Sequence, residues 1–136
     1  DLVVLYNEKF AKPALNFMNM LKADEVLNPA APFAHEVHWV FWGLWHHAGR
    51  RARHGASMMG PDYTWWHGMY EVGKHYYTEF LPAVIHAAET KSPAMKKKYT
   101  RLVDEHLAQT EHSWMKGLSP EEAENLRKMY QDRYGK

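Results

Sequence analysis

The stretch of sequence that decides the fold runs from Phe33 to His54 and reads FAHEVHWVFWGLWHHAGRRARH. Trp39, Trp42 and Trp45 recur at every third position, a spacing that places them on nearly one face of an α-helix. Histidines occupy other sides of the same helix, so aromatic rings cover more of its surface than one core-facing stripe requires. The stretch therefore predicts a helix that needs a further partner: another subunit, a flat aromatic cofactor, or both.

Four more helices are expected along the chain. Apolar residues at helical spacing predict a helix over 2–22, which Pro13 should bend or divide, and a loop follows over 24–32. Gly55 is expected to end the helix over 33–54. Further helices are expected over 61–90, with a possible kink at Pro82, and over 92–117. A capping box at Ser119 predicts a last helix over 119–134. No stretch alternates with a period of two, so the predicted fold class is all-α, with about five helices.

The composition excludes several classes of protein. Seventeen Lys and Arg against sixteen Asp and Glu leave a formal charge of +1, which indicates neither nucleic acid nor anionic lipid as a partner. No apolar run is long enough for a membrane span. The chain has no cysteine and therefore no CxxCH site for covalent haem attachment. It begins at Asp1 without an initiator Met, so we expect a processed or partial product.

Imidazoles and carboxylates alternate in the predicted third helix. His67, Glu71, His75 and Glu79 follow one another at intervals of four, which places them along one helix face. One interpretation is that each histidine simply bonds to a neighbouring carboxylate. The other is that the carboxylate orients an imidazole that ligates a metal. The sequence leaves both interpretations open.

Haem suits these residues better than other metal centres do. A di-iron or di-manganese bundle needs an inward-facing Glu-x-x-His motif, and a zinc hydrolase typically uses His-Glu-x-x-His; the sequence contains neither. Haem accepts axial histidines and packs on Trp, Phe and Met. Arg50, Arg51 and Arg53 could pair with its propionates, or could equally form a solvated helix end.

The run from Trp45 to Gly68, WHHAGRRARHGASMMGPDYTWWHG, resembles the C-terminal region of the octahaem hydroxylamine oxidoreductase and hydrazine dehydrogenase family. The firm part of the resemblance extends from His35 to Tyr77. It implies a homotrimeric multihaem cytochrome c in the periplasm or, in an anammox bacterium, the anammoxosome. Such an enzyme oxidises hydroxylamine to nitric oxide or nitrite, or hydrazine to dinitrogen, and passes electrons to a redox cytochrome partner.

The family attaches its haems through CxxCH sites that precede this region, so the resemblance implies that residues 1–136 are a single helical segment from the C-terminal end of a larger enzyme. Residues 33–77 would form a haem-facing helix pair, and residues 92–136 would face solvent or the trimer. Catalysis would belong to the whole assembly. Two alternatives remain: a free-standing helical module that binds haem or a metal, and a structural domain whose aromatic faces meet a protein.

The resemblance also assigns residues. Tyr63 best matches the tyrosine that the family links covalently to the catalytic haem of a neighbouring subunit, although a buried tyrosine at a helix start is the plainer alternative. The presence of this tyrosine favours oxidation over reduction. The candidate axial ligands are His47 and His54, then His46 and His67; the reserve ligands are His35, His38 and His75; the expected surface histidines are His86, His106 and His112. Arg50, Arg51, Arg53, Met59 and Trp66 are the expected haem-binding residues, and Met58 and Met59 could also serve only in packing.

Overall fold

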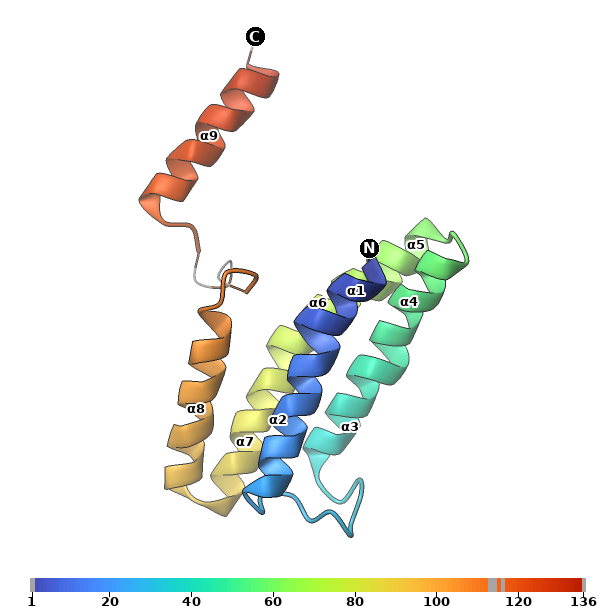
Figure 1. Ribbon diagram of the computed structural model, residues 1–136, viewed down its shortest axis with the longest axis vertical. Helices are drawn as coiled ribbons and strands as arrows, with labels where there is room; N and C mark the ends of the chain where they lie inside the picture. Colours follow the sequence, from blue (N-terminus) through green and yellow to red (C-terminus); the bar gives the residue numbers. More distant parts are fainter. Residues whose placement is uncertain (1, 113–114, 116, 136) are drawn as a thin grey trace. The chain divides into compact units, whose positions relative to one another are not determined.

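The computed structural model describes residues 2–112, 115 and 117–135, and five continuous helical stretches account for most of them (Figure 1). No strand occurs among these residues, which confirms the all-α prediction. The chain divides into two compact units, one extending to Val103 and the other beginning at Asp104. Each unit is described separately below.

Three of the helical stretches change between α and π geometry along their length. The first consists of α1 (Leu2–Tyr6), the π-helical segment η1 (Asn7–Ala11) and α2 (Lys12–Ala23). The second consists of α3 (Glu36–Trp42), η2 (Gly43–Gly49) and α4 (Arg50–Ser57). The third consists of α5 (Pro61–Thr64), η3 (Trp65–Tyr70), α6 (Glu71–His75), η4 (Tyr76–Phe80) and α7 (Leu81–Lys91). The last two helices are α8 (Pro93–Leu107) and α9 (Pro120–Tyr134).

Two of the π-helical segments end two residues before a proline. Pro13 lies in the first turn of α2, after η1, and Pro82 lies in the first turn of α7, after η4. A proline inside an α-helix lacks an N–H group and its ring crowds the carbonyl one turn earlier. In a wider π turn the backbone bonds run between residues five positions apart, so the chain can remain helical where the α pattern is interrupted. The first helical stretch therefore continues through Pro13 instead of being divided there.

The expected end of the second helix at Gly55 is wrong. The helix continues to Ser57, and the backbone N–H groups of Met59 and Gly60 then donate to the carbonyls of Ala56 and Gly55, at 3.4 and 2.8 Å. This pattern is a Schellman motif, and Met59 occupies its left-handed position with φ of 57°. The helix ends two residues later than expected because a methionine takes the conformation in which glycine is usual.

The fourth helix, by contrast, is shorter than expected, and two histidines lie where it ends. It ends at Leu107 instead of continuing to Gly117; positions 113, 114 and 116 of the expected span lie outside the described residues. His106 and His112 are both buried and their ring centroids are 4.3 Å apart, so the chain turns back over itself between them. The expectation that these two histidines lie at the surface is therefore wrong.

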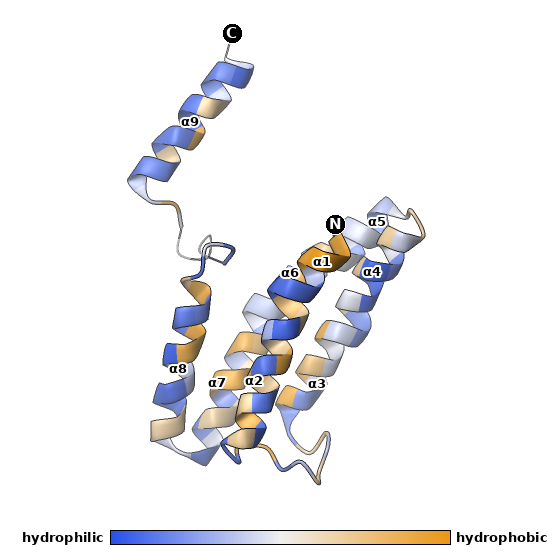
Figure 2. Cartoon of the chain, viewed as in Figure 1, coloured by the Kyte–Doolittle hydropathy of each residue, from blue (hydrophilic) through white to orange (hydrophobic). Residues whose placement is uncertain are grey.

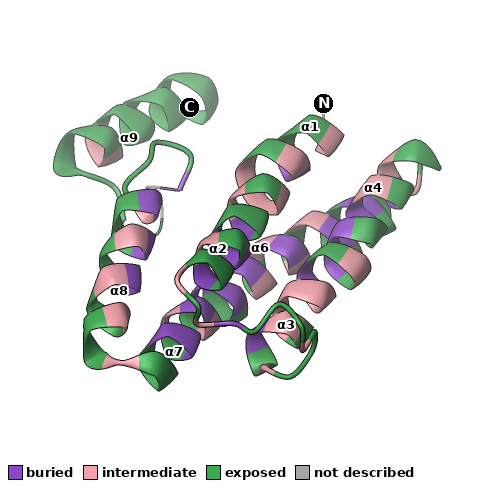
Figure 3. Cartoon of the chain, turned by 60° about the horizontal axis from the view of Figure 1, so that its bottom comes forward, coloured by how far each residue is buried: buried purple, intermediate pink, exposed green. Residues whose placement is uncertain are grey.

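The core of the first compact unit is aromatic and aliphatic. Tyr6, Tyr76, Phe80 and Leu44 are almost completely buried. Figure 3 shows buried segments along α2, α6 and α7. Phe10 and Tyr76 pack edge to face, with ring centroids 5.2 Å apart, an arrangement that aromatic pairs prefer. Figure 2 shows α1 as hydrophobic along its length. The aromatic residues of the third helical stretch thus hold the first and second stretches together.

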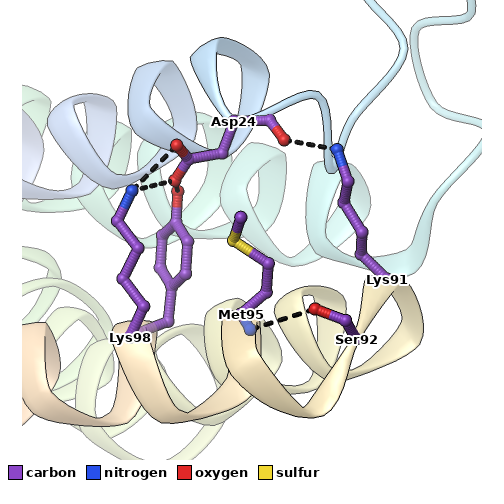
Figure 4. Close-up of polar contacts among 6 residues, drawn as sticks. Asp24, Lys91, Ser92, Met95 and Lys98 are labelled. Atoms are coloured by element: carbon purple, nitrogen blue, oxygen red, sulfur yellow. Dashed lines mark hydrogen bonds and ion pairs between the residues drawn. The ribbon is translucent and has the colours of Figure 1, made fainter.

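A polar cluster fixes the start of α8 against the end of α2 (Figure 4). Lys98 Nζ donates to both carboxylate oxygens of Asp24, at 2.8 and 2.6 Å, and Tyr99 Oη donates to Oδ2 at 2.7 Å. Lys91 Nζ donates to the backbone carbonyl of Asp24 at 2.6 Å. The bonds from Lys98 and Tyr99 lower the pKa of the Asp24 carboxyl. Asp24 is therefore ionised at neutral pH and joins helices that are more than seventy positions apart in the sequence.

Candidate functional site

A cavity of about 450 Å³ lies where α4 meets α5. Its size is within the range of small-molecule and cofactor sites. All of its walls come from one short part of the chain, the end of the second helical stretch and the beginning of the third. The lining residues are His46, His47, Arg50, Arg51, His54, Gly55, Met58, Gly60 and Tyr63.

Beside the cavity, α4 and the third stretch approach each other unusually closely. A Cβ atom on Gly55 would lie 2.6 Å from the backbone nitrogen of Thr64, and one on Gly68 would lie 2.6 Å from the Cα atom of Ala52. Thr64 Oγ1 donates to the carbonyl of Gly60 at 2.8 Å and so fixes the first turn of α5. The two glycines bring the backbones together, and Tyr63 is held beside the histidines of α4.

The cavity is cationic. Arg50 makes no ion pair among the described residues, whereas Arg51 Nη1 bonds to Glu71 Oε2 at 2.6 Å. No carboxylate lines the cavity within the described part of the chain. An occupant with at least one negative group would therefore meet complementary charge.

His46 is the least solvated of the three cavity histidines. Its ring stacks on Trp42 with centroids 4.2 Å apart, and its Nδ1 atom is buried without a hydrogen-bond partner among the described residues. Loss of solvation, with a smaller contribution from His47 and Arg50, lowers the pKa of His46 below the usual 6.5. The imidazole is neutral at pH 7, which is the form that ligates metals.

The predicted site residues separate into two groups. The cavity brings together His46, His47, His54, Arg50, Arg51 and Tyr63. The other predicted residues, His67, Arg53, Met59 and Trp66, are not among its lining residues.

The residues outside the cavity have other contacts. Arg53 Nε donates to the carbonyl of Gly49 at 3.1 Å, and its guanidinium lies over the Tyr6 ring. Met59 and Trp66 are 87% and 66% exposed. A haem confined to the cavity would therefore not contact these three side chains. They would contact only a haem that extends beyond the cavity or one held elsewhere in an assembly.

His67 lies beside the cavity between two carboxylates. Its Nε2 atom is 3.6 Å from Asp62 and its Nδ1 atom is 3.5 Å from Glu71, the residue that also bonds to Arg51. Its ring centroid is 5.5 Å from that of Tyr63. The alternation of imidazole and carboxylate along this helix thus places His67 next to Glu71, as the sequence pattern suggested.

The reserve histidines have structural contacts. His75 Nε2 hydrogen-bonds to the carbonyl of Val40 at 2.8 Å, which joins α6 to α3, and its Nδ1 atom is 3.6 Å from Glu79. His35 Nδ1 accepts from the backbone N–H of Val37 and caps α3. The Nδ1 atom of His38 is buried without a described partner. His86 is exposed on α7, as expected.

Sequence reasoning missed three contributions to this region. It did not identify Gly55 and Gly60 as walls of the cavity, and it treated Trp42 only as part of an aromatic face, not as the stacking partner of His46. The glycine in a helix with bulky neighbours was a usable signal, because an interior glycine destabilises a helix unless close packing requires it. The expected exposure of aromatic rings on the second helix is correct for Trp39 and Trp45. Trp65 and Trp66 of the third stretch are exposed as well.

Comparisons with known proteins assign no family. No protein family, curated protein or solved structure matches this chain.

Within the described residues, no group of three or more His, Cys, Asp or Glu side chains is arranged to hold a metal ion by itself. None of the described helices has the length and apolarity that crossing a membrane requires.

Proposed function

We propose that this chain is the helical part of a multihaem oxidoreductase that oxidises hydroxylamine or hydrazine, and that the cavity between α4 and α5 receives the edge of a haem attached elsewhere in the enzyme. The observation that supports this most is the lining of the cavity. Three histidines, two arginines and Tyr63, all predicted from the sequence as haem-site residues, lie together there. The homotrimer, the redox cytochrome partner and the extracytoplasmic location are parts of the same proposal.

The residues of the cavity fit a haem by their chemistry. Arg50 and Arg51 offer guanidinium groups to propionate carboxylates. His46 carries a buried, unpartnered nitrogen, and His47 and His54 offer imidazoles from the same helix face. No three such side chains among the described residues are arranged to hold a metal ion together, so the haem iron would be ligated by one histidine of the three. When bound, haem iron would supply the redox centre that accepts electrons from the nitrogen substrate.

Tyr63 is the residue of this chain nearest to a catalytic role in the proposal. It lines the cavity, it is 59% exposed, and His67 lies next to it. An exposed phenol at the mouth of the cavity can reach a group contributed by a neighbouring subunit. Mass spectrometry of the assembled enzyme should find the peptide containing Tyr63 carrying a haem, and Tyr63→Phe should abolish that link. An unmodified Tyr63 peptide in active enzyme would reject the crosslink.

A second function is favoured by the fact that one chain builds the whole cavity. The chain could be a free-standing module that binds haem without catalysis. The two functions differ in which residues would hold the haem: residues elsewhere in the enzyme together with this chain in the first case, and this chain alone in the second.

Optical titration of the 136-residue chain separates them. The two probes are a haem peptide that carries its own CxxCH histidine, and free ferric haem. The first function predicts a low-spin spectrum with the haem peptide only, and the second predicts stoichiometric binding of free haem. His47→Ala and His54→Ala test the ligand, and His86→Ala on exposed α7 is the control. No low-spin species with either probe would refute haem ligation by this chain.

A further inference from the structure

Helix α9 has an apolar face that nothing in its own compact unit covers. None of its fifteen described residues is buried, and Figure 3 shows it as exposed almost throughout. At about 100° per residue, Ala123, Leu126, Tyr130 and Tyr134 fall within an arc of about 80°, and we call these four residues the α9 stripe. The Tyr130 and Tyr134 rings stack along it with centroids 5.9 Å apart. A helix of this length is marginally stable alone in water, so a stripe of this kind is expected to pack against something.

The charges of α9 are divided between its two halves. Residues 120–126 contain Glu121, Glu122 and Glu124 and no basic residue, a net charge of −3. Residues 127–134 contain three basic residues and one acidic residue, a net charge of +2. This division also suits the dipole of the helix itself, which explains the charges but not the stripe. Two copies of α9 side by side would attract each other if antiparallel and repel each other if parallel.

Two charges occupy positions that decide the orientation. Glu122 and Arg133 are eleven residues apart, just over three whole turns, so both lie along the same edge of the α9 stripe. The Glu122 carboxylate is held in place because its Oε2 atom accepts from the backbone N–H of Ser119 at 2.8 Å. When the two-fold axis of an antiparallel pair passes near residue 128, midway between these two residues, Glu122 of each helix faces Arg133 of the other.

We propose that α9 pairs antiparallel with α9 of a second copy of this chain, burying the α9 stripe and placing Glu122 opposite the partner subunit's Arg133. The apolar stripe provides the attraction, and the charges select the orientation, as flanking charges do in coiled coils. The contact does not depend on haem. If the enzyme is also a trimer, a two-fold contact of this kind joins two trimers.

The test is the association of the 136-residue chain, measured by sedimentation across a range of concentration and salt. The expected species has twice the mass of the 16.0 kDa chain. Arg133→Glu should weaken association about tenfold at low salt, because both symmetry-related contacts become repulsive. Lys128→Glu makes the same change of charge on the opposite side of α9 and should change association less than twofold. High salt should reduce the difference between these two variants.

Glu122→Gln distinguishes the two orientations because it should weaken association in one and strengthen it in the other. Glutamine retains the capping box, so the helix start is preserved. An antiparallel pair loses an attraction and should weaken about threefold, whereas a parallel pair loses a repulsion and should tighten. Glu121→Gln, on the far side of the helix, is the matched control. A monomer at all concentrations, a parallel response to Glu122→Gln, or association that Leu126→Asp leaves unchanged in a chain of native helicity would each overturn the proposal.

Discussion

Replacing Gly55 with alanine should destabilise the protein, although the same change normally stabilises a helix. The added Cβ atom would lie 2.6 Å from the Thr64 nitrogen and 2.7 Å from the Tyr63 carbonyl carbon. Both are backbone atoms, so no change of rotamer relieves the overlap, and α4 must move away from α5. Overpacking of this kind costs about 1–3 kcal/mol, against about 1 kcal/mol gained from alanine in a helix. We expect a net loss of about 1 kcal/mol in the free energy of unfolding.

Gly73→Ala is the matched control for this prediction. Gly73 is also helical, in α6, and a Cβ atom there would meet no atom within 4 Å. That change should raise the free energy of unfolding by about 0.5–1 kcal/mol. Urea denaturation of the two variants should therefore give midpoints shifted in opposite directions from wild type. A Gly55→Ala variant as stable as Gly73→Ala would refute the close approach of α4 and α5, and with it the walls of the cavity.

Three further predictions concern other parts of the chain. Burial, reinforced by His112, lowers the pKa of His106 from 6.5 to about 4, so the folded state favours the neutral ring. One pKa unit corresponds to about 1.36 kcal/mol, so the stability that the neutral His106 ring contributes is fully present above pH 6.5, and about 3 kcal/mol of it is lost by pH 4. Denaturation of the wild-type protein at several pH values should show this loss, and His106→Gln should not. Asp24→Asn should cost about 1–3 kcal/mol in the same assay, because Lys98 loses its charged partner. Met59→Gly should raise the melting temperature, by relieving about 1 kcal/mol of left-handed backbone strain.

Much of the fold follows from local signals in the sequence. Ser119 and Glu122 form both bonds of the predicted capping box, at 3.2 and 2.8 Å. Ser92 accepts from the backbone N–H of Met95 at 3.1 Å, as its predicted position before Pro93 requires. These features depend on residues three positions apart, so the sequence alone specifies them.

The failures occurred where distant residues decide the outcome. Gly55 was expected to end a helix because glycine often does, but its role is to accept the backbone of α5. His106 and His112 were expected at the surface because each stands alone on a polar stretch, yet each is buried beside the other. Contacts of this kind are set by packing, which periodicity does not describe.

The candidate site was predicted in composition more than in geometry. Its histidines, arginines and Tyr63 were identified together because one continuous run of sequence contains them all, and the helix–turn–helix folds that run around one cavity. His67 and Arg53 belong to the same run but not to the cavity, because Asp62 and Glu71 flank the first and Tyr6 and Gly49 contact the second. Closeness in the sequence thus identified the candidate site residues. The direction of each side chain then decides which of them line the cavity.

The π-helical segments give the cavity a dependence on chain length as well as on residue identity. Compared with an ordinary α turn, each such segment holds roughly one extra residue, and a one-residue change rotates everything beyond it by about 100°. Deleting Ala48 from η2 (Gly43–Gly49) would therefore turn His46 and His47 away from Arg50, His54 and Tyr63 without altering any of those side chains. A shortened gene of this kind would encode a helix pair that folds but has lost the cavity.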